Sequence, residues 1–118
     1  SGLYYTGLCY EYLHNLDSAK VYLQKAVNMS PKSPVGMYRL GMVESMLHLN
    51  AEAISHLETA AQLYQPNPTL MRLIYKNMGQ SEAESGNKAK AIDAWKKALA
   101  YEPDDDITSK IKQISGSK

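Results

Sequence analysis

Phenylalanine is absent from this sequence of 118 residues, and cysteine and tryptophan occur once each. The single cysteine, Cys9, excludes an internal disulfide and the Cys/His spacings that hold zinc; it fits a reducing compartment such as the cytoplasm. We expect no metal and no cofactor. The net charge of +1 offers no attraction to nucleic acid or anionic lipid, so we expect neither as a partner. No apolar run reaches the length that crosses a bilayer, and no leader is visible, so we expect no membrane insertion.

What the sequence does contain is a side-chain pattern that occurs three times. Each copy has a glycine followed by alanine, a large residue and a second alanine. The three copies are Gly7, Ala19, Leu23 and Ala26; Gly41, Ala53, Leu57 and Ala60; and Gly79, Ala91, Trp95 and Ala98. Matched positions are 34 residues apart between the first two copies and 38 between the last two. A fixed period in this range predicts stacked helical hairpins, which form an all-α solenoid.

Each copy predicts two helices. We expect them over residues 3–14, 18–29, 34–48, 51–64, 68–85 and 88–101. Ser33 and Asn67 each precede a proline, which predicts an N-cap followed by the first helical residue. Asp17 and Asn50 are the expected N-caps of the second helices in the first two hairpins. The four extra residues of the third copy amount to about one helical turn, so they predict a longer first helix there.

A short capping helix is expected over residues 106–115. Ile107, Ile111 and Ile114 form one apolar stripe on it, as is usual where a solenoid ends. The acidic residues 104–106 are favoured at a helix start by the helix dipole, and they lack the spacing of a calcium loop.

The repeated residues resemble the tetratricopeptide repeat. That pattern places a large residue, Leu-Gly and Tyr in a first helix, then Ala, a large residue, Ala and Pro in a second. The match covers about nine-tenths of the chain, in copies near residues 1–33, 34–67 and 68–105 of one domain over 1–118. Glu44 and Glu82 replace the family's preferred aromatic residue, and Gln65 stands where a proline is expected. The resemblance implies a right-handed superhelix that acts as a protein-interaction scaffold.

The resemblance also implies a concave groove, lined by the first helices, that holds a peptide or helix of a partner protein. The residues expected to contact the partner are Tyr4, Leu8, Tyr12, Val35, Tyr38, Arg39, Met42, Met46, Leu73, Lys76 and Glu84. Independently of the family, Tyr4, Leu8 and Tyr12 share one helix face, and Tyr38, Met42 and Met46 share another. We expect an apolar cleft for an apolar or amphipathic segment, oriented by Arg39, Lys76 and Glu84. The alternative is that some of these side chains are core between helices.

One binding mode of the family is not expected here. Family members that bind the C-termini of chaperones hold the terminal carboxylate with lysine and asparagine at fixed groove positions. The corresponding residues of this chain are Tyr4, Leu8, Arg39, Leu73 and Asn77. The carboxylate clamp is therefore absent.

A second function remains open, because tyrosines crowd into the first helix. Four of the nine are Tyr4, Tyr5, Tyr10 and Tyr12. An apolar outer face at a solenoid end needs a cover, so the module either self-associates as a homo-oligomer or packs within a longer parent chain. We expect no enzymatic activity, since no phosphate loop, nucleophile elbow or dinucleotide fingerprint occurs in the sequence.

Overall fold

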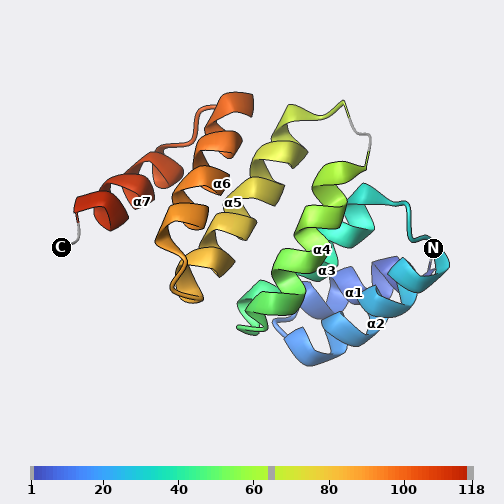
Figure 1. The fold of residues 1–118 in the computed structure, drawn as a ribbon. Coiled ribbons are helices and arrows are strands. Elements are labelled where there is room, and N and C mark those ends of the chain that lie inside the picture. Colours follow the sequence, from blue (N-terminus) through green and yellow to red (C-terminus); the bar gives the residue numbers. More distant parts are fainter. Residues whose placement is uncertain (1, 64–65, 117–118) are drawn as a thin grey trace.

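The computed structural model describes residues 2–63 and 66–116, and every regular element within them is an α-helix. In chain order these are α1 (Gly2–Tyr12), α2 (Leu16–Met29), α3 (Pro34–Met46), α4 (Asn50–Gln62), α5 (Pro68–Glu84), α6 (Lys88–Tyr101) and α7 (Asp105–Gly116). Figure 1 shows them as successive helix pairs, with α1 and α7 at opposite ends. The predicted all-α solenoid is confirmed. None of the helices in these residues combines the length and the apolar character needed to span a bilayer.

The helices contact one another largely in chain order. The pairs α1–α2, α3–α4 and α5–α6 form hairpins. Between hairpins, α2 packs against α3 and α4 against α5, and α7 packs against α6. The molecule measures 45 × 29 × 21 Å along its principal axes, so it is elongated, as expected for a stack of hairpins. Helix α3 also contacts α5, which places first helices of neighbouring hairpins side by side.

A close approach between the two helices of each hairpin explains the repeated glycines. A Cβ atom added to Gly41 would lie 2.7 Å from Cγ of Leu57, and one added to Gly79 would lie 2.3 Å from Cδ1 of Trp95. Distances this short do not occur between real side-chain carbons, because atoms in a close-packed interior sit about 3.5–4 Å apart. The glycine in each copy of the repeated pattern is therefore what allows the two helices of a hairpin to approach this closely.

The capping helix α7 closes the core at one end of the stack. Ile107 is fully buried, and Ile111 and Ile114 pack against the same cluster of side chains that contains Trp95. The indole Nε1 of Trp95 donates a hydrogen bond to the backbone carbonyl of Lys76 at 3.1 Å, so the ring is fixed in both its apolar and its polar part. The predicted apolar stripe of the capping helix is confirmed.

The first helices of the second and third hairpins begin as predicted. The Ser33 hydroxyl accepts a hydrogen bond from the Gly36 amide at 3.2 Å, and the Asn67 side chain accepts one from the Leu70 amide at 3.1 Å. Helix α5 has 17 residues and α3 has 13. The extra residues of the third copy therefore lengthen its first helix, as predicted.

The predicted N-caps of two second helices were wrong. Helix α2 is capped by Asn15, whose side chain accepts a hydrogen bond from the Ser18 amide at 3.3 Å, and Asp17 lies within its first turn. Helix α4 begins at Asn50 itself, and the preceding residue, Leu49, forms no side-chain cap. Helix α2 therefore starts before its predicted cap, Asp17, and α4 starts at its predicted cap, Asn50.

The turn inside each hairpin explains these earlier starts. His14 and His48 adopt left-handed backbone angles, with φ of 60° and 62°, and Gly86 has φ of 85° at the matching place. The next amide then bonds five residues back, as from Asn15 to the Tyr10 carbonyl at 2.8 Å. This compact reversal ends α1 and α3 two residues before the predicted ends at 14 and 48. The predicted helix end at residue 64, and Gln65, lie outside the described residues.

A buried ion pair between α3 and α4 was not predicted from the sequence. The Glu44 side chain is 1 % exposed, and its Oε1 lies 2.6 Å from Nδ1 of His56. This hydrogen bond to Glu44 raises the pKa of His56 above its ordinary value, against the effect of burial. His56 thus supplies the partner that a carboxylate in the core requires.

This pair predicts a dependence of stability on pH. Because the pKa of His56 is raised in the folded state, its contribution is fully present below about pH 6.5, the pKa of an unfolded histidine. It is lost as pH rises through the folded pKa. We expect thermal unfolding between pH 6 and 9 to show this loss as a fall in the melting temperature. Glu44→Gln should remove this part of the profile; parallel profiles for the two proteins would contradict the assignment.

The glycine contacts predict the effect of adding one methyl group. We expect Gly79→Ala to lower the free energy of unfolding in urea by about 1–3 kcal/mol, because the new Cβ collides with the Trp95 ring. The matched control is Gly2→Ala, where no atom lies within 4 Å and helix propensity favours alanine. Equal stability of both variants would show that the close approach is not required.

Candidate functional site

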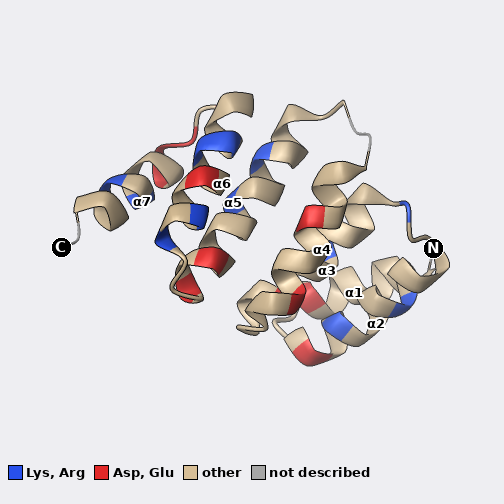
Figure 2. Cartoon of the chain, in the orientation of Figure 1, with Lys and Arg blue, Asp and Glu red and all other residues tan. Residues whose placement is uncertain are grey.

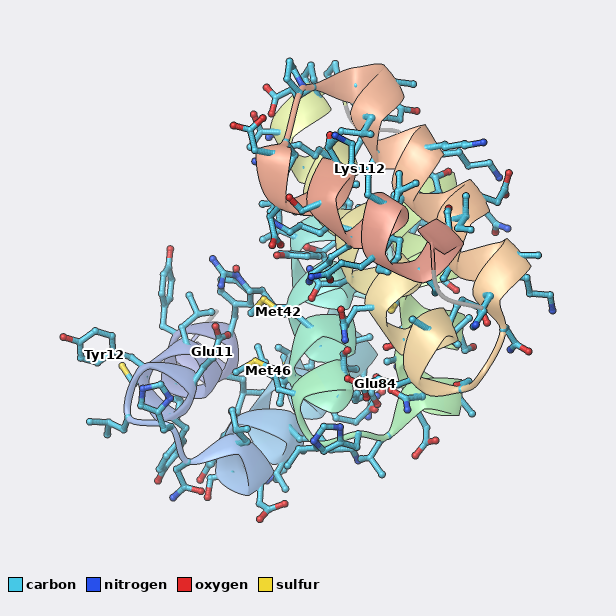
Figure 3. The ribbon with its side chains drawn as sticks, turned by 90° about the vertical axis from the view of Figure 1, so that its left-hand side faces the viewer. Glu11, Tyr12, Met42, Met46, Glu84 and Lys112 are labelled. Atoms are coloured by element: carbon cyan, nitrogen blue, oxygen red, sulfur yellow. The ribbon has the colours of Figure 1, made fainter. Side chains whose placement is uncertain are left out.

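The predicted contact residues come from α1, α3 and α5, the first helices of the three hairpins. Among the apolar ones, Val35 and Met46 are 41 % and 42 % exposed, while Leu8, Met42 and Leu73 are half-buried. Figure 3 shows Met42 and Met46 projecting from the same side of α3. Large apolar side chains left partly open to solvent on one helix face provide a surface that a second apolar segment can cover.

Tyr38 lies beneath this surface instead of on it. Its side chain is 5 % exposed, and its hydroxyl donates a hydrogen bond to the Met42 sulfur at 3.3 Å. Burial raises the pKa of the Tyr38 hydroxyl, against the opposing effect of Arg39 nearby. For this residue the structure favours the alternative that it is core between helices. Its hydroxyl holds the Met42 side chain through the hydrogen bond to sulfur.

Arg39 is paired within the molecule. Its Nη1 lies 3.2 Å from Oε2 of Glu11 on α1, and its guanidinium lies 5.9 Å from the centre of the Tyr38 ring. The second carboxylate oxygen of Glu11 and the Nε of Arg39 are buried and make no hydrogen bond among the described residues. The pair therefore joins α1 to α3, the first helices of the first two hairpins. Its two partners are 28 residues apart in the chain, so no local pattern predicts it.

The two other charged candidates also have partners within the molecule. Lys76 lies 3.1 Å from Asp104 and 3.4 Å from Asp106. Glu84 accepts a hydrogen bond from His48 at 2.9 Å, and this bond holds the pKa of Glu84 below its usual range. Each of the three charged candidates therefore already has a polar partner within the molecule.

Tyr12 lies apart from the methionines. Its side chain is 85 % exposed, and it lines a shallow pocket of about 380 Å³ together with Tyr5, Leu8, Cys9 and Leu13. Figure 3 places Tyr12 at the outer edge of α1, away from Met42 and Met46. The structure therefore separates Tyr12 and Leu8 from Met42 and Met46.

A third grouping contains Tyr4 and Val35. They line a separate pocket of about 200 Å³ together with Ala26 of α2, Gly36 of α3, and Ser30 and Ser33 of the connection between these helices. Leu73 and Asn77 lie on α5, where the Asn77 side chain donates to the Leu73 carbonyl at 2.9 Å. This bond occupies the amide within its own helix.

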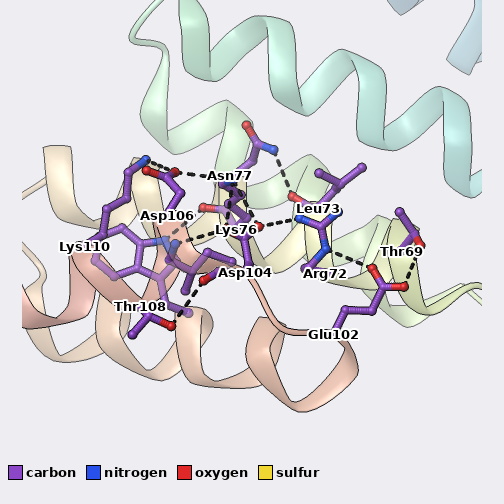
Figure 4. Close-up of polar contacts among 12 residues, drawn as sticks. Thr69, Arg72, Leu73, Lys76, Asn77, Glu102, Asp104, Asp106, Thr108 and Lys110 are labelled. Carbon is purple, nitrogen blue, oxygen red and sulfur yellow. Dashed lines mark hydrogen bonds and ion pairs between the residues drawn. The ribbon is translucent and has the colours of Figure 1, made fainter.

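An ionic cluster fixes α7 to α5, as Figure 4 shows. Arg72 bonds to Glu102 at 3.0 Å and also to Asp104, which accepts from Lys76 as well. Asp104 further accepts from the Ile107 amide at 3.1 Å and so caps α7. Burial disfavours its ionised form, but these hydrogen bonds outweigh burial and lower the pKa of Asp104. The predicted role of the acidic run at a helix start is confirmed, whereas Arg72 was missed.

The distribution of ionisable groups is mixed over the described residues. Figure 2 shows acidic and basic residues on most helices without a continuous stripe of one sign. In residues 2–63 and 66–116, no three His, Cys, Asp or Glu side chains converge as the ligands of a metal ion would. The prominent apolar feature of α3 is the pair Met42 and Met46, which lies on the helix that also carries Arg39 of the Glu11–Arg39 pair.

Two family models match the chain, and both describe the tetratricopeptide repeat. One covers residues 1–33 and the other residues 73–105, which together are more than half of the sequence. These are the first and third copies of the repeated pattern. A search of curated proteins found no significantly similar sequence.

Several solved structures share the fold. The N-terminal domain of stress-induced protein-1 (STI-1) from C. elegans aligns with a TM-score of 0.83 and 15 % identity, covering 97 % of this chain and 92 % of that one. The first TPR of Spaghetti (RPAP3), bound to the HSP90 peptide SRMEEVD, gives 0.88 and 22 % identity, with coverages of 97 % and 88 %. YrrB, a TPR protein with an unusual peptide-binding site, gives 0.82 and 23 %, with coverages of 94 % and 55 %.

The ionic cluster generates a prediction about the capping helix. We expect Asp104→Ala to lower the free energy of unfolding by about 2–4 kcal/mol, because α7 loses its N-cap and two cations lose a buried partner. Hydrogen exchange should accelerate at the amides of α7. The control is Asp93→Ala, which breaks an exposed pair with Lys97 and should cost below about 0.5 kcal/mol. Unchanged protection of α7 in the first variant would refute the role of the cluster.

Proposed function

Because the chain belongs to the tetratricopeptide repeat family, we propose that it is a protein-interaction module whose concave side binds a peptide or a helix of a partner protein. The observation that carries this proposal is the partly exposed methionine pair Met42 and Met46 on one side of α3, next to the Glu11–Arg39 pair that joins α3 to α1. Methionine side chains are flexible and polarisable, so they adapt to partners of different shape. The fold shared with peptide-binding TPR proteins supports the same class of function.

The partner segment is apolar or amphipathic. Arg39 and Lys76 already have partners of opposite charge in the free protein, and Glu84 accepts a hydrogen bond from His48, so a ligand that paired with them would first have to replace those partners. Such an exchange adds little net affinity, since it substitutes one ion pair for another. Apolar contact with Met42 and Met46 therefore provides the attraction, and the charged residues bordering it orient the segment.

We propose that the module does not bind acidic C-terminal peptides such as SRMEEVD, which the RPAP3 domain holds. Four positions of the family's carboxylate clamp carry Tyr4, Leu8, Leu73 and Asn77, none of which is a cation. The fifth, Arg39, is paired with Glu11. A terminal carboxylate bound here would lose its hydration without gaining a charged partner, which is unfavourable.

The proposal predicts a specific effect of one substitution. A displayed library of 12-residue random peptides is selected on the protein, and dissociation constants of the enriched peptides are measured by fluorescence anisotropy. We expect Met46→Glu to raise these constants by at least about tenfold, which corresponds to about 1.4 kcal/mol, because it puts a charge into the apolar contact. The matched control is Met29→Glu on α2, since Met29 is also an exposed methionine, with 68 % of its surface open.

The controls make the outcome decisive. Circular dichroism should give both variants the helix content of the parent protein, and SRMEEVD should show no binding to any of them. Peptides that bind Met46→Glu as tightly as the parent would contradict the groove proposal. Peptides lost equally from Met29→Glu would place the binding surface on the convex side instead.

A further inference from the structure

A small pocket of about 200 Å³ lies where α1, α2 and α3 meet. Its lining consists of the buried Ala26 and Gly36, the half-buried Tyr4 and Ser33, and the exposed Ser30 and Val35. The pocket thus has a buried floor and an open rim. Sites for small molecules measure about 300–1,000 Å³. This pocket is smaller, and its size suits a single side chain of a binding partner.

The lining of this pocket favours an apolar side chain. None of the six lining residues carries a formal charge, and the Ser33 hydroxyl is already bonded to the Gly36 amide at 3.2 Å. An ionised side chain that entered would lose its hydration and would meet no opposite charge in the lining, which is unfavourable. A large apolar side chain gains free energy by leaving water.

The pocket lies at one end of an apolar stripe along α3. Each residue of an α-helix turns by about 100°, so residues seven and eleven positions apart lie within about 40° of one another around the axis. Val35, at the rim of the pocket, has this spacing from Met42 and Met46. Figure 3 shows the two methionines on the same side of α3. We call Val35, Met42 and Met46 the α3 stripe; at about 1.5 Å per residue it is about 16 Å long.

Arg39 lies between Val35 and Met42 on the same side of the helix. Its Nη1 lies 3.2 Å from Oε2 of Glu11, so its charge is paired. A partner carboxylate placed opposite this pair would be repelled by Glu11, and a partner cation would be repelled by Arg39. The position that faces the pair therefore suits an uncharged polar residue.

A helical partner segment fits the α3 stripe better than an extended one. The peptide groups of an extended segment need hydrogen-bond partners where a surface covers them. Polar groups beside the stripe are already used: the Tyr38 hydroxyl donates to the Met42 sulfur at 3.3 Å. The Asn77 side chain donates to the Leu73 carbonyl at 2.9 Å. A helix satisfies its peptide groups internally, so it requires only apolar contact from the surface.

Building on the function proposed above, we propose that the partner segment is an amphipathic α-helix that lies along the α3 stripe and inserts one large apolar side chain into the pocket between α1, α2 and α3. We call that side chain the anchor. The helix carries an uncharged polar residue opposite Arg39. It carries apolar residues seven and eleven positions from the anchor, opposite Met42 and Met46.

The spacing is tested by selection. A displayed library of random peptides about 18 residues long, enough for a helix to form on binding, is selected on the protein. We expect the enriched sequences to have apolar residues seven and eleven positions from a large apolar anchor, and circular dichroism to show that these peptides gain helix on binding. An extended segment would cover the same stripe within about five residues. Enriched sequences with that shorter spacing, and no gain of helix, would overturn the proposal.

The pocket is tested by a pair of substitutions between α2 and α3. Ser30→Trp places a ring at the rim of the pocket, and the matched control Lys32→Trp places one at an exposed residue outside the lining. Circular dichroism should give both variants the helix content of the parent protein. By fluorescence anisotropy, we expect Ser30→Trp to raise the dissociation constants of the enriched peptides at least about tenfold, and Lys32→Trp to change them less than about twofold.

The anchor itself is tested by replacing it with alanine in a selected peptide. We expect this change to weaken binding about tenfold to the parent protein but less than about threefold to Ser30→Trp, because the added ring already fills the pocket. An equal loss of affinity for both proteins would overturn the proposal.

The outcomes separate this proposal from that of the previous subsection. Peptides weakened by Met46→Glu but not by Ser30→Trp would leave the groove proposal standing and overturn the anchored helix. Peptides that bind Met46→Glu as tightly as the parent protein would contradict both.

Discussion

The contact of a glycine with a large side chain inside each hairpin is the constraint on which the rest of the structure depends. Gly41 against Leu57 and Gly79 against Trp95 bring the paired helices so close that not even a methyl group fits between them. Each hairpin is thereby a thin, rigid unit with two apolar faces, and it becomes stable only when neighbours cover both. The stacking that results lines up the first helices on one side of the molecule, and so creates the surface proposed to bind a partner.

Because the hairpins stack in one direction, the molecule has long sides and two ends. The sides and the ends serve different purposes. On the side that we propose to bind a partner, Met42 and Met46 lie near Arg39 and Lys76, whose charges are paired within the molecule, so the proposed attraction is apolar contact. The two ends differ: an ionic cluster around Asp104 holds α7 against one end, whereas Tyr5, Tyr12 and Leu13 on α1 are exposed at the other.

The sequence predicted what is local and repeated, and it missed what is long-range. The repeat period, the caps at Ser33 and Asn67 and the longer α5 all depend on nearby residues, and the structure agrees with them. The cap at Asn50 failed because a left-handed turn residue starts the helix earlier than side-chain preference indicates. In the candidate site, helical spacing identified the methionine face but could not separate a core residue such as Tyr38 from a surface one. The partner of Arg39 depends on how the hairpins stack, which no local pattern encodes.

Methyl NMR of the protein labelled at its six methionines tests the central claim most directly, since these residues sample the concave side, the core and the convex side. A selected peptide is titrated while the methionine methyl signals are followed. The account predicts that Met42 and Met46 shift progressively and saturably, while the exposed Met29 on α2 and the buried Met71 on α5 keep their positions. Shifts confined to Met29, or saturable binding that leaves Met42 and Met46 unmoved, would show that partners bind elsewhere on the stack.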